Sequence, residues 1–249
     1  IEEDFTEYRI SEALMKLYRL FWDEFSGWYL EMVKPGYRQP TDRATMDATK
    51  AFFDRLLRTL HPFMPFITEE IWQHMAPRKD GESITVAALP APQPFDQALL
   101  ERIEQLKEAV SSVRNIRKEH NIPNKEALEL YVIGDDNYHR EYNPLLQKMA
   151  NLNRVEEIAE KRSDAAAFIV KTTEYFVPLG GSIDVEEELK KLKADLAYQE
   201  GFLASVLKKL SNERFVQNAP AKVIETEHAK RHDAEAKIKA LQERIAQLG

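Results

Sequence analysis

The sequence predicts a mainly α-helical protein that contains one small α/β unit, and three patterns along its 249 residues support this prediction. Apolar residues at helical spacing fill the first half of the chain. Strand-length apolar segments follow Pro123, and a heptad pattern then runs to the last residues. We therefore expect a helical bundle over 1–122, a small α/β subdomain over 123–182 and an antiparallel coiled-coil hairpin over 183–249.

Composition narrows the class of protein. Hydrophobic residues make up 43% and charged residues 31%, as in ordinary globular proteins. The absence of cysteine excludes disulfides and thiolate sites and suits a reducing, cytoplasmic compartment. We expect no membrane span, because no apolar run approaches about 18 residues. The start IEEDFTEYRI has no signal-peptide features and reads like a cut inside a longer protein.

Two long amphipathic helices are predicted at the start. The first runs from Phe5 to Lys34 and ends at Pro35-Gly36, and the second follows Thr41-Asp42. The apolar residues of the first recur at i, i+3, i+4 and i+7 spacing, and they are Leu14, Leu17, Tyr18, Phe21, Phe25, Trp28 and Met32. This spacing indicates a helix that is buried along one face.

The stretch LHPFMPFITEEIWQ (60–73) carries two prolines that a helix interior does not tolerate. We interpret it as a corner between two packed helices. Pro62 ends the first helix, and Pro65 lies near the start of the next, where a missing N–H costs little. We expect Thr68 to cap the second helix. The apolar side chains expected to bury the corner are Phe63, Phe66 and Ile67.

The remaining elements are predicted from the positions of prolines and from the spacing of apolar residues. Prolines between Pro77 and Pro94 indicate a strap over the bundle, and a helix is expected over 96–121. In the α/β unit we expect a helix over 143–152. The expected strands are ALELYVIG (127–134), VEEIAE (155–160), AAAFIVKT (165–172) and EYFVPLGG (174–181). Two heptad arms around Asn-Ala-Pro (218–220) indicate the final hairpin, whose seam residues begin with Val185 and end with Leu248.

A basic cluster lies in SSVRNIRKEHNIP (111–123). Arg114, Arg117 and Lys118 follow i, i+3, i+4 spacing, and Lys107 extends the same face. Cations at this spacing match a surface that tracks phosphates. The alternative, which spacing alone favours, is a solvated helix face that is partly neutralised by neighbouring glutamates. The net charge of −7 argues against a wholly basic nucleic-acid binder but permits such a local face.

Aromatic residues offer a second candidate surface. Trp22 and Tyr29 can stack on unpaired bases, the usual route to recognition of single-stranded RNA. Aromatic stripes on helices are more often core, and we expect Phe21, Phe25 and Trp28 to be buried. The end of the first helix at 34–38, with Arg43 beyond it, is the better candidate for exposed contact.

Catalytic and metal chemistry have weak support. His228 and His232 have the i, i+4 spacing of metal ligands, but no HExxH glutamate lies between them, and a solvated helix face explains them better. No glycine-rich phosphate loop, GxSxG motif or nucleophile with a nearby base is present. We expect no catalytic residue and no metal site in this chain.

Four segments in order resemble one family. FWDEFSGWYLEMVKP, LHPFMPFITEEIWQ, ESITVAALP and VRNIRKEHNIP are similar to the helical anticodon-binding domain of class I aminoacyl-tRNA synthetases of the valine, isoleucine and leucine group. The tail from LSNERFVQNAP onward resembles the C-terminal coiled coil of the valyl-tRNA synthetases. The HIGH and KMSKS catalytic motifs of the family are absent, so this part is expected to be inactive by itself.

The resemblance implies a function in tRNA binding. The partners would be valine tRNA and the N-terminal catalytic and editing domains of the same chain, with ATP and Mg used only by those domains. We expect a monomer. The implied contacts on the anticodon side are Trp22, Tyr29, Arg38, Arg43, Arg114, Asn115, Arg117 and Lys118. Those on the coiled coil are Lys208, Lys209, Arg214, Lys230 and Arg231.

Two other interpretations stay open at this point. The first is the equivalent part of an isoleucyl- or leucyl-tRNA synthetase. The second is a non-catalytic helical scaffold whose coiled-coil arm binds other proteins. A protein-binding arm should show an exposed apolar stripe, whereas the heptad residues of this tail are expected to pair with each other.

Overall fold

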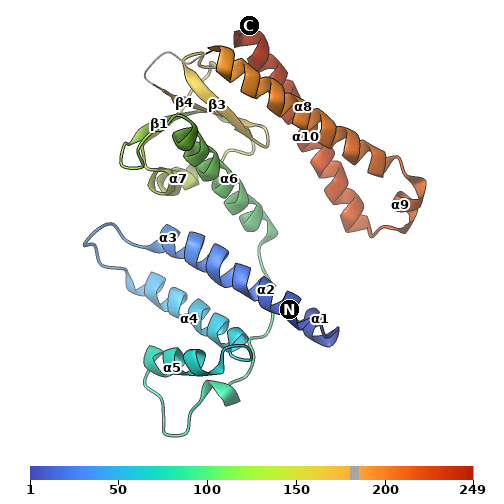
Figure 1. Cartoon of the computed structure of the whole chain (residues 1–249). Helices are drawn as coiled ribbons and strands as arrows, with labels where there is room; N and C mark the ends of the chain where they lie inside the picture. The colour runs from blue at the N-terminus through green and yellow to red at the C-terminus, as the bar shows by residue number, and fades with distance from the viewer. Residues whose placement is uncertain (180–184, 249) are drawn as a thin grey trace. The chain divides into compact units, whose positions relative to one another are not determined.

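The computed structural model describes residues 1–179 and 185–248, which fall into two units, Ile1–Phe95 and Asp96–Gly249 (Figure 1). Helices dominate both units, and the second also contains a four-stranded sheet. The division between these two compact units lies at Phe95–Asp96. The helix over 97–119 belongs to the second unit because it packs on another helix and on the sheet there.

The predicted first helix is observed as several segments. They are α1 (Glu2–Thr6), α2 (Ile10–Arg19), η1 (Leu20–Tyr29) and α3 (Leu30–Val33). The chain breaks between α1 and α2 because Tyr8 adopts a left-handed φ of 59°. From α2 to α3 the helix is continuous, but η1 is π-helical, which widens each turn to i→i+5 hydrogen bonds.

Aromatic packing joins this long helix to α4 (Arg43–Leu60). Asp42 caps α4 by accepting a 2.8 Å hydrogen bond from the Thr45 backbone N–H, as its position before the helix predicts. The Phe25 ring lies parallel to that of Phe53, with centroids 5.6 Å apart. Phe25 is buried and Phe21 is half-buried, so the prediction that these rings form core is confirmed for Phe25.

The double-proline stretch forms a corner, as predicted, with Pro65 as the first residue of α5 (Pro65–Met75). Two details of the prediction are wrong. Thr68 is no cap: it is fully buried, its hydroxyl donates to the Met64 carbonyl at 2.8 Å, and it lies 2.7 Å from His61 Nδ1. Phe66 is 89% exposed and Ile67 is also exposed, because the first turn of α5 directs both outward.

The strap predicted between Pro77 and Pro94 is confirmed, since this segment packs on α4 and α5. It contains a short 3₁₀ turn, η2 (Ile84–Val86), and Ile84 is buried against Leu57 and Trp72. Polar bonds also hold it. The Glu69 carboxylate accepts from Ser83 Oγ at 2.6 Å and from the Ile84 N–H at 3.0 Å, and these bonds, led by that from Ser83, lower the pKa of Glu69.

The second unit begins with α6 (Gln97–Glu119), which Asp96 caps. The elements that follow are β1 (Leu128–Ile133), η3 (Arg140–Tyr142), α7 (Asn143–Ala150), β2 (Leu152–Glu157), β3 (Ala165–Val170) and β4 (Thr173–Pro178). The strand order is β2-β1-β4-β3, with β1 and β2 parallel and the other pairs antiparallel. All four predicted strands and the helix are therefore present. Their ends differ by a few residues.

Helices cover the sheet. α6 packs against α7 and β3, and α7 packs against β2 (Figure 1). Leu130, Val132 and Phe176 are fully buried in the centre of the sheet, on β1 and β4. These buried side chains form the core of the sheet.

The last elements form a helical hairpin of α8 (Val185–Leu210), α9 (Glu213–Asn218) and α10 (Ala221–Leu248). α8 and α10 lie side by side and run in opposite directions (Figure 1). The side chains of Val185 and Leu248 lie outside the described residues. Arg244 of α10 anchors the hairpin to the sheet: it is 4% exposed and donates to the carbonyls of Arg162 and Ala165 at 2.7 and 2.8 Å.

Candidate nucleic-acid interface

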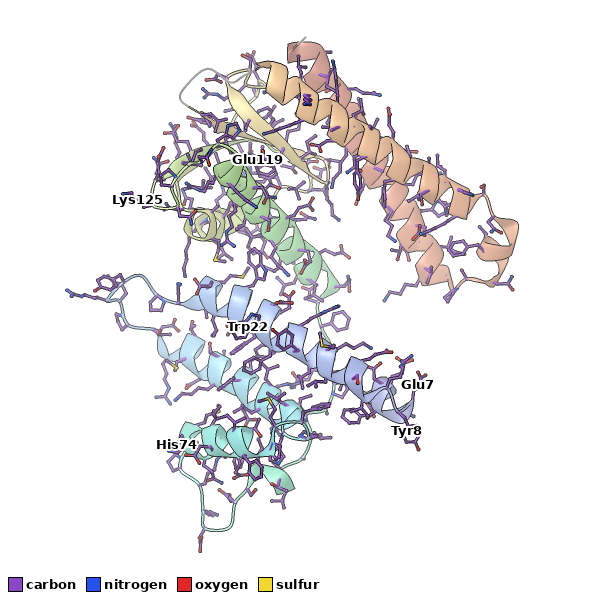
Figure 2. The ribbon with its side chains drawn as sticks, in the orientation of Figure 1. Glu7, Tyr8, Trp22, His74, Glu119 and Lys125 are labelled. Carbon is purple, nitrogen blue, oxygen red and sulfur yellow. The ribbon has the colours of Figure 1, made fainter. Side chains whose placement is uncertain are left out.

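Two predicted aromatic contacts on the long helix differ in their surroundings. Trp22 is 60% exposed on η1 and presents an indole surface to solvent (Figure 2). Tyr29 is half-buried, and its hydroxyl forms a 3.0 Å hydrogen bond with Thr49 Oγ1 of α4. Trp22 is thus available for stacking, whereas the Tyr29 hydroxyl is already engaged in helix packing.

The loop between α3 and α4 displays a cation beside an aromatic ring. Arg38 adopts a left-handed φ of 60°, and its guanidinium carbon lies 5.1 Å from the centroid of the exposed Tyr37 ring. A ring and a guanidinium together suit a base and its phosphate. Arg43, at the start of α4, is exposed and donates from Nε to Asp47 at 2.7 Å. That hydrogen bond raises the pKa of Arg43.

The basic cluster of α6 does not form one face. Asn115 and Lys118 are exposed. Arg114 is exposed as well, and its guanidinium donates to the Met149 carbonyl at 2.9 Å. Arg117 is only 3% exposed and points into the second unit. Of the predicted phosphate-tracking contacts on α6, Arg114, Asn115 and Lys118 therefore remain exposed and Arg117 does not.

Arg117 has a structural role, and its burial does not support the predicted contact with RNA. Its guanidinium donates to four backbone carbonyls, those of Pro123, Glu126, Ala150 and Asn151, at 2.7–3.3 Å. Burial lowers the pKa of this group. The sequence did contain a signal, because Arg117 continues the stripe of Leu106, Val110 and Val113 at i+4 and so falls on the apolar face.

The hairpin cations are partly neutralised by the hairpin itself. Lys230 and Lys209 lie 2.7 and 3.6 Å from the buried carboxylate of Glu227, and the Lys230 hydrogen bond is the main cause of its lowered pKa. Arg231 lies 3.7 Å from Glu235. Lys208 is exposed, with no ion-pair partner among the described residues. The side chain of the fifth predicted contact, Arg214, lies outside the described residues.

Two further lysines of the hairpin escaped the sequence analysis. Lys191 of α8 and Lys237 of α10 each form an ion pair with a glutamate of α6. Their glutamate partners, Glu108 and Glu119, stand 11 residues apart, which is three helical turns and places both on one face. Charge spacing on α6 gave this signal, but only the fold identifies what the face meets.

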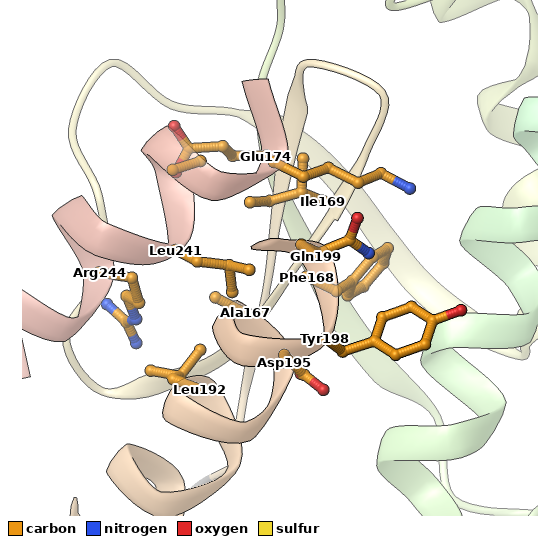
Figure 3. Close-up of a pocket in the computed structure, with 12 residues that line it drawn as sticks. Ala167, Phe168, Ile169, Glu174, Leu192, Asp195, Tyr198, Gln199, Leu241 and Arg244 are labelled. Carbon is orange, nitrogen blue, oxygen red and sulfur yellow. The ribbon is translucent and has the colours of Figure 1, made fainter. Parts of the chain in front are cut away.

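The structure also contains two cavities of about 330 Å³ each. One lies between the hairpin and β3 (Figure 3), and the other opens beside the rings of Phe21, Phe25 and Phe53. His228 and His232 are both exposed on α10. In the described parts of the chain, no group of three His, Cys, Asp or Glu side chains is placed to hold a metal ion.

Comparison with known families matches both units. The family described as the anticodon-binding domain of tRNA ligase matches residues 1–132, and the chain belongs to this family. The more particular match lies at the other end. Residues 184–249 match the family described as the valyl tRNA synthetase tRNA binding arm. The resemblance to the valyl enzymes is thus confirmed.

Individual relatives agree with this assignment. A valine–tRNA ligase of Parabacteroides distasonis is 58% identical over 248 residues, which are 100% of this chain and 28% of that protein. Its counterpart from Phocaeicola vulgatus is 54% identical over 98% of this chain and 28% of its own length. The Enterococcus faecalis enzyme is 37% identical over 100% of this chain and 29% of its own length.

The chain thus spans somewhat more than a quarter of the length of these relatives. It matches their C-terminal region. Within the described residues, no helix combines the length and apolar character that a membrane span needs.

Proposed function

We propose that the chain is the tRNA-binding, C-terminal part of a valine–tRNA ligase. The observation that carries this proposal is the pair of family matches on separate segments, an anticodon-binding domain over 1–132 and a tRNA binding arm over 184–249. Exposed cations and aromatic rings on the corresponding elements support it.

The recognition follows from the exposed groups. Trp22 and the Tyr37–Arg38 pair would stack on unpaired bases of the anticodon loop, while Arg43 would contact phosphate. The hairpin, acting as an antiparallel coiled coil, would bind the outer corner of the tRNA largely by shape, with Lys208 as its most accessible phosphate contact.

The remaining steps belong to the rest of the parent protein. Preceding catalytic and editing domains would bind ATP and Mg and attach valine, whereas residues 1–249 would only hold the tRNA. We also propose a monomer in the cytoplasm, with functional divisions at 1–122, 123–182 and 183–249. In this division α6 serves the anticodon side, although it packs in the second unit.

Filter binding of valine tRNA and isoleucine tRNA across a salt series tests the proposal. We expect tighter binding of valine tRNA, and a loss of affinity of about 10-fold or more between about 50 and 200 mM salt, because each phosphate contact releases counterions. Equal affinity for both tRNAs would count against the proposal, and tighter binding of isoleucine tRNA would favour the isoleucyl alternative. Undetectable or salt-insensitive binding favours a protein-binding scaffold.

A further inference from the structure

Two ion pairs connect the base of the hairpin to α6. Lys191 Nζ of α8 lies 3.0 Å from Glu119 Oε2, and Lys237 Nζ of α10 lies 3.2 Å from Glu108 Oε1. Glu119 is the last residue of α6 (Figure 2). We call these two pairs the hairpin latch, because each arm of the hairpin contributes one lysine to it.

The latch is made of partly exposed groups. Lys237 and Lys191 are 26% and 37% exposed, and Glu108 and Glu119 are 47% and 49% exposed. Ion pairs with this exposure are weak and are screened by salt. The Arg244 anchor is different, because its buried guanidinium donates to two carbonyls. Beside this anchor, Lys161 Nζ lies 2.8 Å from Glu243 Oε2 of α10. The two latch pairs are thus weak attachments away from the firm one at Arg244.

Packing between the latch and the anchor is incomplete. The cavity of about 330 Å³ lies between the hairpin and β3 (Figure 3). Phe168 and Ile169 line it from β3, Tyr198 and Gln199 from α8, and Leu241 from α10. The cavity separates apolar side chains of the hairpin from those of β3, so the two are packed incompletely on this side.

We propose that Lys191 and Lys237 are two additional RNA-phosphate contacts, and that a tRNA backbone opens the latch by competing with Glu108 and Glu119 for them. The inference rests on the proposed tRNA binding. A phosphodiester backbone presents several charges along one line, so it can replace two separate carboxylates at once. Opening the latch therefore adds two cations to the RNA-binding surface of the hairpin.

Replacement of the two glutamates by glutamine, which removes their charge and keeps their shape, tests the competition. The E108Q/E119Q variant keeps both lysines and removes their competitors, so we expect its tRNA affinity to rise by about 3- to 10-fold at low salt. The control is E101Q/E104Q, which makes the same charge change on the same helix; Glu104 pairs with Lys107 of α6 itself. We expect the control to change affinity by less than about 2-fold.

Removal of the lysines gives the complementary result. K191A/K237A should weaken tRNA binding and reduce the slope of log affinity against log salt by up to about 2, since each lost phosphate contact contributes about 0.7–0.9. An unchanged slope would exclude both lysines from the RNA contact. Equal affinities for E108Q/E119Q and E101Q/E104Q would exclude the competition.

A distance measurement separates this inference from the proposed function. The chain has no cysteine, so spin labels on cysteines introduced at the exposed Ser111 of α6 and Lys239 of α10 report the hairpin position alone. We expect a longer or broader distance distribution with tRNA, with inorganic polyphosphate and in E108Q/E119Q. If tRNA does not bind but polyphosphate broadens the distribution, the latch stands and the tRNA function fails. If tRNA binds and the distribution is unchanged, the latch is refuted.

Discussion

Replacement of Arg117 by methionine should destabilise the second unit far more than the same replacement of an exposed cation of α6. The guanidinium joins the C-terminal end of α6 to the 123–126 turn and to the end of α7. Methionine matches the unbranched aliphatic part of the arginine side chain and is apolar, so it keeps that packing without donating a hydrogen bond. The substitution therefore tests mainly the four hydrogen bonds.

The magnitude follows from those bonds. A hydrogen bond from a charged donor contributes about 1.5–3 kcal/mol, but these contributions do not simply add. Three of the carbonyls keep another donor: Glu126 N to Pro123, Asn151 Nδ2 to Glu126 and Leu128 N to Asn151. Methionine also avoids the cost of burying a charge. We therefore expect Arg117→Met to cost about 3–5 kcal/mol, which is less than the sum of four such bonds.

Two optical signals distinguish the units, because one of them reports the first unit alone. The three tryptophans, Trp22, Trp28 and Trp72, all lie in the first unit, so their fluorescence reports only that unit. Far-UV circular dichroism reports both. In urea titrations we expect the circular dichroism transition of the variant to shift to lower urea. In thermal unfolding followed by circular dichroism, the midpoint temperature of the second unit should fall by about 6–20 °C, at about 2–4 °C per kcal/mol for a unit of this size.

The matched control is Lys118→Met, the same substitution at the next residue, where the side chain is exposed. We expect it to change the free energy of unfolding by less than about 0.5 kcal/mol. If the free energies of unfolding of the two variants differ by less than about 1 kcal/mol, the hydrogen bonds of Arg117 do not stabilise this unit as argued. A change in the tryptophan transition of Arg117→Met would also contradict the reasoning.

Three further predictions follow from other elements. Asp42→Ala should cost about 1 kcal/mol in urea unfolding followed by tryptophan fluorescence, because it removes the cap of α4, and an unchanged midpoint would contradict this. Because the pKa of Glu69 is lowered in the folded protein, its carboxylate stabilises the strap fully above the ordinary pKa of 4.5, and this stability is lost as pH falls through the folded pKa. Glu69→Gln should flatten the dependence of unfolding stability on pH in that range, and a dependence identical to that of the unchanged chain would refute it. Lys208→Ala should weaken tRNA binding in filter assays and lower the salt slope by about 1, whereas Lys209→Ala should do less because Lys209 must first leave Glu227; the reverse order would contradict the contact assignment.

Features with strictly local causes were predictable from the sequence. Asp42 and Asp96 cap helices because a carboxylate before a helical stretch meets unpaired N–H groups. Pro65 begins α5 because the first helical residue needs no N–H donor. The strands and the hairpin arms followed from their periods. The caps and the proline need no distant partner, and the strands and arms could be recognised from residue spacing before their partners were known.

Features with non-local causes were not predictable in the same way. Thr68 has the chemistry of a cap, but His61 and the corner give its hydroxyl another partner. The π-helical turns of η1 lie where its rings pack on α4, a partner that local spacing does not reveal. Among the candidate contacts, exposure could be anticipated for Arg43. The burial of Arg117 and the pairing of Lys209 and Lys230 with Glu227 required the fold.

The contact of Arg244 with β3 has a consequence for aggregation. β3 is an edge strand of the sheet, and an open edge presents unpaired carbonyl and N–H groups that can pair with a strand from another molecule. Arg244 occupies the Ala165 carbonyl at the start of β3, and α10 brings a cation to that edge. The arm proposed to reach for RNA therefore also protects its own domain from strand addition. A chain shortened before Arg244 would lose that protection, even where the sheet still folds.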